Sequence, residues 1–128
     1  MKNILVDSSV WIDYFKLVDK KSAPLSELID ENRVCMNDLI LAELIPSIRH
    51  ADEEKLVELL YSLVRFPVNV DWKEIIEYQY QNLKSGINKV SLADMIIVQN
   101  VIQNGLILFT LDKHFRLMSK SFKFEMYE

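Results

Sequence analysis

The chain has 128 residues, half of them hydrophobic, which is enough for one domain with a core but leaves little room for two. No run approaches the roughly 18 apolar residues of a membrane span, which excludes that class. The formal net charge of −4 does not favour general attraction to nucleic acid, so any action on nucleic acid must depend on a local site.

The single cysteine, Cys35, and the N-terminal segment indicate a cytoplasmic protein. One cysteine cannot form an internal disulfide, which agrees with a reducing compartment. Because Cys35 lies in an apolar run between Val34 and Met36, we expect a buried structural thiol. One cysteine and two histidines do not supply the ligands of an ordinary zinc site. The first residues lack the longer apolar region and the cleavage site of a signal peptide.

Short apolar runs alternate with helical patterns through the first half of the chain. One such run ends at Asp7, and an amphipathic helical pattern then continues to Leu17. Pro46 is expected to bend the helix that contains it or to end its regular part. The expected elements are a strand at 3–6, helices at 9–17 and about 24–31, a strand at 33–36, a helix from Asn37 or Asp38 to about Ile48, and a helix at about 52–64.

The alternation continues through the second half, where cap residues mark the helices. Asp71 and Ser91 precede two helical patterns, and Gly86 and Gly105 follow them. The strands are continuously apolar, which favours a mainly parallel sheet covered by helices on both faces, in a single α/β domain of three α/β/α layers over residues 1–128. The expected elements are a strand at 66–70, helices at 72–84 and 92–104, a strand at 106–110, a short helical turn from Asp112, and an edge strand at 122–126.

Four carboxylates stand in apolar surroundings, where a charge costs free energy unless it is paired, hydrogen-bonded or bound to metal. Because sites in open parallel sheets form beyond the carboxyl ends of the strands, the four can meet at one edge. A carboxylate cluster without His or Cys suits Mg²⁺ or Mn²⁺, and such an ion can activate water and stabilise a phosphodiester under attack. The four residues are Asp7, Glu43, Asp94 and Asp112.

Each of these acids also has a purely structural explanation. Asp7 can cap the helix that follows it, and Asp94 stands three residues after Ser91, as in a capping box. Glu43 can lie on a solvated helix face, and Asp112 can be a turn residue. A cap and a metal ligand can be the same residue, so it is the joint pattern of four acids that favours a site.

At these residues the sequence resembles the PIN-domain family, and within it the VapC-type toxins of bacterial and archaeal toxin–antitoxin pairs. Each resembling segment contains one of the four acids, in the family's order, and together the segments span most of the chain from residue 3 to about 115. The segments are Ile4–Asp13, Leu41–Leu44, Ser91–Ile97 and Gly105–Phe115.

The resemblance implies a doubly wound α/β/α fold and the cleavage of single-stranded RNA with Mg²⁺ or Mn²⁺. It implies that Ser8 and Thr110 help to hold metal, water or carboxylates. It also implies a homodimer and a cognate antitoxin protein that blocks the site. The catalytic and metal-binding residues that it implies are Asp7, Glu43, Asp94 and Asp112.

One position departs from the family's pattern. Many relatives have another acid two residues after the last Asp, where this chain has His114. A second metal would have one ligand fewer, and His114 can instead contact a phosphate, move a proton or be a partly exposed loop residue. Lys113 and Arg116 can meet RNA phosphates or be solvated surface residues.

The helices carry many apolar side chains whose place is ambiguous. Helical spacing makes core packing the first interpretation, although some of them can form a groove for the antitoxin. Tyr78 and Tyr80 remain open between core, dimer contact and base stacking. The ambiguous residues of the earlier helices are Trp11, Tyr14, Phe15, Leu56, Leu59, Leu60 and Leu63.

Other functions place demands that this chain meets less well. A phosphoacceptor receiver domain needs an acid pair after the first strand, and a haloacid-dehalogenase-like phosphatase needs a second Asp two residues after the first; Ser8 and Ser9 stand at these positions. The more serious alternative is a catalytically weak domain that binds RNA or protein. The complete set of four acids argues against it.

Overall fold

Five short strands form one sheet in the order β3-β2-β1-β4-β5, and every pairing between them is parallel. The computed structural model describes residues 1–16 and 22–128, so Leu17 of the first expected helix lies outside the described residues. The parallel sheet of the sequence prediction is therefore confirmed. The strands are β1 (Ile4–Val6), β2 (Val34–Met36), β3 (Val64–Arg65), β4 (Ile107–Phe109) and β5 (Glu125–Met126).

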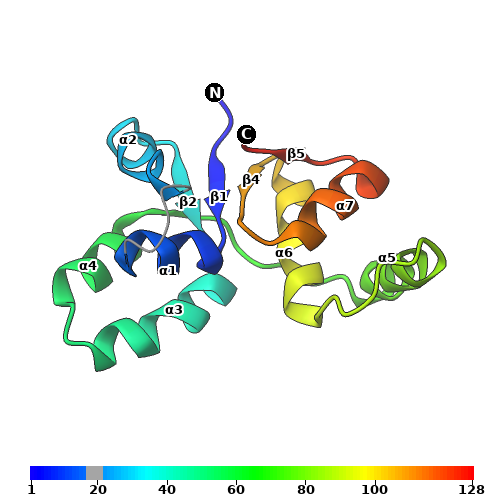
Figure 1. The fold of residues 1–128 in the computed structure, drawn as a ribbon, viewed down its shortest axis with the longest axis horizontal. Helices are drawn as coiled ribbons and strands as arrows, with labels where there is room; N and C mark the ends of the chain where they lie inside the picture. Colours follow the sequence, from blue (N-terminus) through cyan, green and yellow to red (C-terminus); the bar gives the residue numbers. More distant parts are fainter. Residues whose placement is uncertain (17–21) are drawn as a thin grey trace.

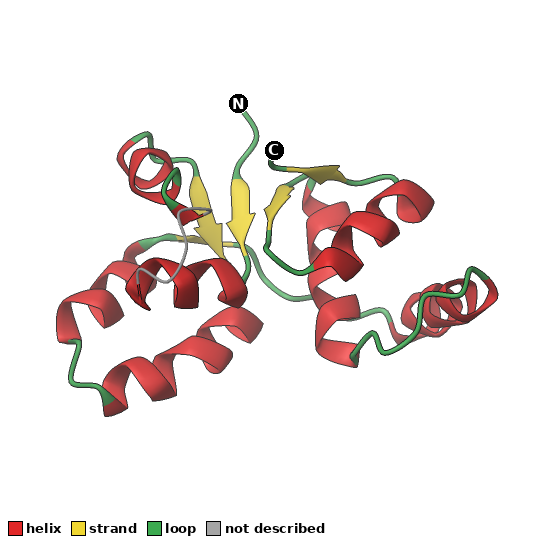
Figure 2. Ribbon diagram, in the orientation of Figure 1, coloured by secondary structure: helices red, strands yellow, loops and turns green. Residues whose placement is uncertain are grey.

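Seven helices of the described residues flank this sheet, which makes the fold α/β (Figure 2). Figure 1 shows α1–α4 beside β1 and β2, and α5–α7 on the other side of the molecule, nearer β4 and β5. Within the described residues, no helix is both long and apolar enough to cross a membrane. The helices are α1 (Ser8–Lys16), α2 (Leu25–Asp30), α3 (Asp38–His50), α4 (Glu54–Ser62), α5 (Trp72–Lys84), α6 (Leu92–Asn104) and α7 (Lys113–Phe122).

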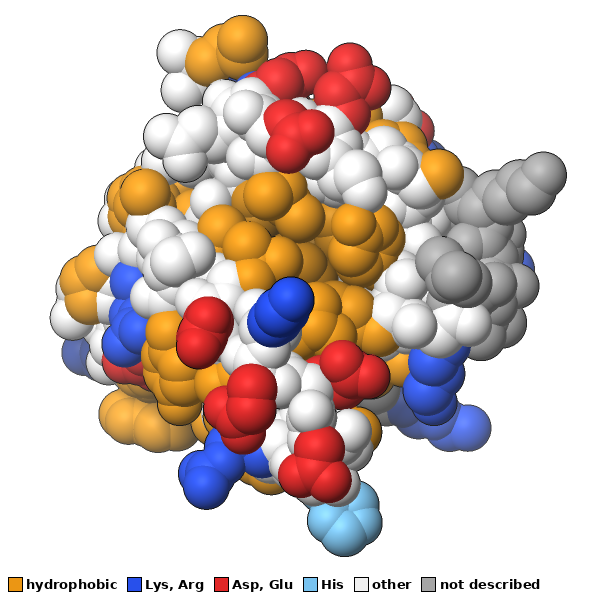
Figure 3. Space-filling model, turned by 90° about the vertical axis from the view of Figure 1, so that its left-hand side faces the viewer, with side chains coloured by type: hydrophobic (Ala, Val, Ile, Leu, Met, Phe, Trp, Pro, Cys, Tyr) orange, Lys and Arg blue, Asp and Glu red, His pale blue; other side chains and the backbone are white. Residues whose placement is uncertain are grey.

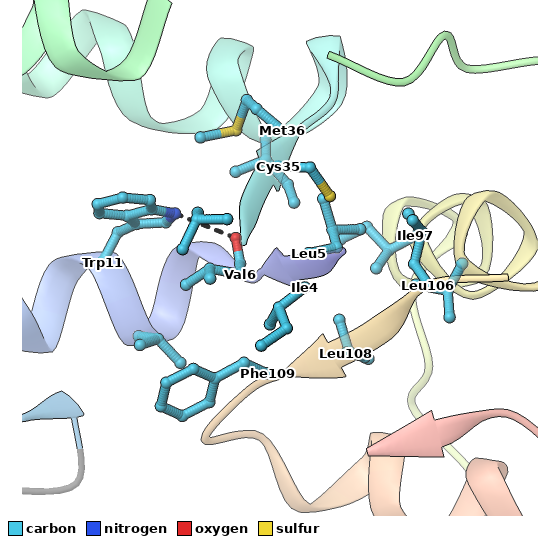
Figure 4. Close-up of a cluster of buried hydrophobic side chains, with 14 of the residues drawn as sticks. Ile4, Leu5, Val6, Trp11, Cys35, Met36, Ile97, Leu106, Leu108 and Phe109 are labelled. Atoms are coloured by element: carbon cyan, nitrogen blue, oxygen red, sulfur yellow. Dashed lines mark hydrogen bonds between the residues drawn. The ribbon is translucent and has the colours of Figure 1, made fainter. Parts of the chain in front are cut away.

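The central strand β1 is completely buried, as its uninterrupted apolar sequence predicts. Its neighbours β2 and β4 are buried along their whole length as well. Figure 4 shows the side chains of these three strands packed together. Trp11 of α1 is fully buried beside them, and its indole Nε1 donates a hydrogen bond to the Val6 carbonyl at 3.1 Å. This contact fixes α1 directly after the turn at Asp7.

The third strand was predicted in the wrong place. β3 is Val64–Arg65 rather than 66–70, and the chain leaves the sheet after Phe66, whose N–H still donates to the Met36 carbonyl at 2.9 Å. Pro67 has no N–H and so cannot continue the ladder. The segment after β3 is bound to α6 instead: the Asn100 side chain donates a hydrogen bond to the Pro67 carbonyl at 3.0 Å.

Several helix boundaries also differ from the prediction. Pro46 does not end α3, which continues to His50. The helix expected to reach Val64 ends at Ser62, because the chain turns into β3. The short turn expected from Asp112 is the full helix α7, which takes Phe122 from the predicted last strand. The predicted helix over 92–104 is confirmed at both ends.

Candidate active site

The direction of chain winding reverses between β1 and β4. From β1 the chain moves outward to β2 and β3, returns to β4 on the other side of β1, and ends at β5. Ligands of open parallel sheets bind at such a reversal, beyond the carboxyl ends of the strands. Asp7 follows β1 there, its N–H donating to the Phe109 carbonyl at 2.9 Å, and Thr110 follows β4. The sheet therefore places these two residues side by side.

The carboxylate of Asp7 is buried, with 6% of the residue exposed, and two hydroxyl groups stabilise it. Ser9 donates to Oδ2 at 3.0 Å, and Thr110 donates to the same oxygen at 2.9 Å. None of the hydrogen bonds between described residues makes this carboxylate a helix cap. A buried carboxylate held by hydroxyls at one oxygen keeps its second oxygen for another partner.

The hydroxyl beside Asp7 comes from Ser9, which the sequence analysis did not select. Ser9 also accepts a hydrogen bond from the Leu111 N–H at 3.1 Å, so it connects the ends of β1 and β4. The side chain of Ser8 makes none of the hydrogen bonds between described residues, and its predicted role stays a prediction. The motif Asp7-Ser8-Ser9 offers both hydroxyls, and only the path of the chain decides between them.

Asp94 occupies the first turn of α6 and forms the capping box that its spacing suggested. The Ser91 hydroxyl accepts from the Asp94 N–H at 3.1 Å, and Asp94 Oδ2 accepts from the Ser91 N–H at 3.4 Å. The structural explanation of Asp94 is therefore confirmed. It leaves the other carboxylate oxygen without a hydrogen bond from the described residues.

Asp112 caps α7, and this cap also engages His114. Asp112 Oδ1 accepts from the His114 N–H at 2.9 Å and lies 2.8 Å from His114 Nδ1. The N–H of Asp112 donates to the Thr110 hydroxyl at 3.0 Å, which connects this loop to the Asp7 carboxylate. His114 is thus paired with the last acid of the set and occupies a half-buried position.

Glu43 lies on α3 as an exposed residue, yet its carboxyl faces the same group of acids. Partial burial raises its pKa, and the charges of Asp7 and Asp94 raise it further. The helix is positioned by Asn37, a fully buried N-cap that accepts from the Ile40 N–H at 2.9 Å and donates to Asn100 of α6 at 3.1 Å. This link between α3 and α6 was missed by the sequence analysis.

The four predicted acids form one electrostatic group. Burial raises the pKa of Asp94 as well; its hydrogen bonds with Ser91 oppose this, and the charges of Asp112 and Asp7 add to it. Such mutual effects require the carboxylates to be near neighbours. Within the described residues, however, no three His, Cys, Asp or Glu side chains stand close enough together to form a metal-binding group as they are.

Each aspartate of the group uses a single oxygen for hydrogen bonds between described residues. The second oxygen of Asp7, Asp94 and Asp112 makes no such bond. Oriented carboxylates with one free oxygen are what a hard cation needs from its ligands. The arrangement fits Mg²⁺ or Mn²⁺ in the type of donor, although the carboxylates would have to approach one another further.

Several ambiguous side chains belong to the core. Trp11 and Leu60 are fully buried, so they cannot form a docking groove. Tyr78 packs against Phe122 with ring centroids 4.6 Å apart, whereas Tyr80 is exposed. Cys35 is fully buried, and burial raises the pKa of its thiol to about 12, which agrees with a structural role.

Known proteins resemble the chain in sequence pattern and in fold. A family profile described as PIN domain matches residues 4–121. The fold is similar to DNA-bound VapBC from Salmonella typhimurium (TM-score 0.70, 16% identity, 99% of this chain and 98% of that one). It is also similar to FitAcB from Neisseria gonorrhoeae (TM-score 0.71, 18% identity, 98% and 96%). No curated protein sequence matches the chain.

Proposed function

The chain belongs to the PIN domain family, and we propose that it is a divalent-metal-dependent endoribonuclease that cleaves single-stranded RNA, the toxin of a toxin–antitoxin pair. The observation that carries the proposal is the group of carboxylates at the reversal point of the sheet. There the charges of Asp7 and Asp94 raise the pKa of Glu43, and those of Asp112 and Asp7 raise the pKa of Asp94. The VapC-type sequence motifs around these acids support RNA as the substrate.

Mg²⁺ or Mn²⁺ is the cofactor that this donor set fits, held by Asp7, Asp94 and Asp112 with Glu43 beside them. When bound, the ion would supply an activated water molecule and positive charge next to the phosphodiester. The hydroxyls of Ser9 and Thr110 fix one oxygen of Asp7, so this carboxylate needs little reorganisation.

Glu43 has a second role in this proposal, as a proton acceptor. In the metal-free chain, burial and the charges of Asp7 and Asp94 raise the pKa of its carboxyl above that of an ordinary Glu. Glu43 lies on the solvent side of the group, where it can accept a proton from the attacking water and release it to solvent. The hydrogen bond between Asp112 Oδ1 and His114 Nδ1 orients the His114 ring, which can then contact a substrate phosphate.

The test is cleavage of a structured RNA pool by the purified chain, freed of any bound antitoxin, with Mg²⁺, with Mn²⁺ and with EDTA. We expect metal-dependent cleavage that Asp94→Asn abolishes. Ser91→Ala removes the hydroxyl half of the capping box but keeps the Asp94 carboxylate, and Asp71→Asn removes an acid from the N-cap of another helix. Both controls should cleave at close to the parental rate.

Equal cleavage by Asp94→Asn would place the activity elsewhere or in a contaminant. If the folded chain bound divalent metal but cleaved no RNA, the catalytically weak binding module would become the better description. Loss of cleavage in Ser91→Ala as well as Asp94→Asn would mean that helix stability, and not the carboxylate, limits activity.

We propose that the cognate antitoxin covers the apolar area on the α1 and α4 side of the molecule. Figure 3 shows this area with several acidic side chains around it and a basic side chain at its edge. Among the apolar residues of these two helices, Ile12 of α1 is exposed, and Phe15 of α1 and Leu56 of α4 are partly buried. An apolar area with acidic side chains around it fits an amphipathic segment that carries basic residues. Ile12→Glu should weaken capture of the antitoxin encoded beside this chain and leave RNA cleavage unchanged.

A homodimer is the remaining part of the proposal, and α5 offers the surface. Its exposed face carries Trp72, Ile76, Tyr80 and Leu83, with Leu92 beside it, and Ile76 and Leu83 are each 66% exposed. A contiguous apolar face of this kind is typical of an interaction site. Light scattering should give a dimer for the parent and a monomer for Ile76→Glu combined with Leu83→Glu; a monomeric parent would refute this surface.

A further inference from the structure

A cleft of about 320 Å³ lies directly beside the carboxylate group, between the first turns of α7 and the residues that follow β5. Thr110 and Asp112 line both the cleft and the proposed active site, so the two are continuous. The volume falls in the range of roughly 300–1,000 Å³ that is common for ligand sites. We refer to this feature as the α7 cleft.

The α7 cleft brings positive charge next to the acids of a protein whose net charge is −4. Lys113 and Arg116 line it, and both are exposed. Lys113 makes no ion pair with any described residue. Arg116 donates to the two carboxylate oxygens of Glu128 at 2.9 and 3.3 Å. An exposed ion pair of this kind contributes little to stability, so a phosphate can replace the Glu128 carboxylate at small cost.

The opposite wall of the α7 cleft presents an aromatic ring. Tyr127 packs on Phe109 with ring centroids 4.8 Å apart, and its N–H donates to the Leu108 carbonyl at 2.8 Å. The ring is therefore held in place by β4 while it lines the cleft. Single-stranded nucleic acids bind to surfaces that combine backbone-directed cations with aromatic rings on which bases stack.

We propose that the α7 cleft binds the nucleotide next to the cleaved phosphodiester, with Lys113 and Arg116 on its phosphate and Tyr127 against its base. This inference rests on the proposed ribonuclease function. In it, Glu128 competes with the RNA phosphate for Arg116 and so weakens RNA binding. The carboxylates cleave, while the α7 cleft sets the position and direction of the strand.

The test measures binding of a fluorescein-labelled, mixed-sequence single-stranded RNA by fluorescence anisotropy, with every chain carrying Asp94→Asn to prevent cleavage. Lys113→Gln and Arg116→Gln should each weaken binding by about three- to tenfold. Each should also lower the slope of log affinity against log salt by about 0.7, the value for one phosphate contact of a single strand. Lys2→Gln is the matched control, because Lys2 forms an exposed ion pair with Glu125 at the amino ends of the strands, whereas Thr110 and Asp112 of the α7 cleft follow the carboxyl end of β4.

Tyr127 and Glu128 give independent readouts. Tyr127→Leu should weaken binding by about fivefold or more without changing the salt slope, whereas Tyr127→Phe should bind as the parent does. Glu128→Gln should strengthen binding about twofold, and Glu125→Gln, the matched control, should not. Equal weakening by Tyr127→Leu and Tyr127→Phe would overturn the stacking part of the proposal.

The experiments distinguish a failure of the α7 cleft proposal from a failure of the proposed ribonuclease function. If the parent chain cleaves RNA with metal but the changes at Lys113, Arg116 and Tyr127 alter RNA affinity by less than about twofold, the role of the α7 cleft is refuted and the nuclease function stands. If the parent does not cleave and these changes still weaken RNA binding in the predicted pattern, the α7 cleft is an RNA site on a binding module.

Discussion

Two hydroxyl groups hold the Asp7 carboxylate, and removing one of them is a direct test of how the site is built. Thr110→Val keeps the shape of the side chain but removes the hydrogen bond to Asp7 Oδ2, at 2.9 Å, and the acceptor of the Asp112 N–H, at 3.0 Å. Because Asp7 is only 6% exposed, water replaces the lost donor poorly.

The expected destabilisation follows from the charge on the acceptor. A hydrogen bond to an ionised group is worth about 1.5–3 kcal/mol, so the free energy of unfolding should fall by that amount in Thr110→Val. This corresponds to a decrease in Tm of roughly 6–12 °C for a domain of this size. Thr110→Ser keeps the hydroxyl and loses only a methyl group, so it should cost about 1 kcal/mol.

Ser9 allows the same carboxylate to be tested from its other side. Ser9 and Thr110 donate to one oxygen and lie 3.4 Å from each other. After either is removed, the other is the last donor to Asp7, so Ser9→Ala combined with Thr110→Val should cost more than the sum of the single changes, by about 1 kcal/mol.

The assay is urea unfolding at neutral pH with EDTA, followed by tryptophan fluorescence, which reports on buried Trp11 and exposed Trp72. The dependence of the free energy on urea should not change, since the native fold is the same. A loss below about 0.5 kcal/mol in Thr110→Val, or a loss equal to that of Thr110→Ser, would refute the argument that these hydroxyls stabilise a buried charge.

Three further predictions concern other residues. Burial and neighbouring carboxylates raise the pKa of Glu43, so its contribution to stability is present below the unfolded pKa and lost as pH rises through the folded pKa. In EDTA, Glu43→Gln should therefore be more stable than the parent at neutral pH, by less than about 1 kcal/mol after solvent screening, and equally stable in acid. Thermal unfolding at both pH values checks this. Burial raises the pKa of the Cys35 thiol to about 12, so little reactive thiolate is present in the native chain. At mildly alkaline pH, a thiol reagent should label the chain unfolded in urea roughly a hundredfold faster than the native chain. Equal rates would refute the burial of Cys35. Asn37→Ala removes a helix cap and leaves the buried amide oxygen of Asn100 without its donor, so we expect the free energy of unfolding in urea to fall by about 2–4 kcal/mol. Asn37→Ser keeps the cap and should cost about 1–3 kcal/mol; equal losses would mean that the cap does not contribute to stability.

Much of the fold could be predicted because local sequence and tertiary structure agree. The helix at 92–104 was predicted at both ends, since Ser91 with Asp94 and Gly105 are local cap signals that need no distant partner. β1 was recognised because a strand buried on both faces has an uninterrupted apolar sequence. β3 was misplaced, since a two-residue exposed strand carries no such pattern and its length is set by Pro67.

For the candidate site, too, some features follow from the sequence and others only from the tertiary structure. The sequence by itself selected Asp7, Glu43, Asp94 and Asp112, because a carboxylate within an apolar run is unusual at the level of composition. Only the tertiary structure brought them into one electrostatic group, since the strand order places the ends of β1 and β4 together. The choice of Ser9 over Ser8 is also tertiary, because it depends on contacts with residues about a hundred positions away in the chain. A sequence records which groups are available, whereas hydrogen bonds between distant segments decide which of them meet.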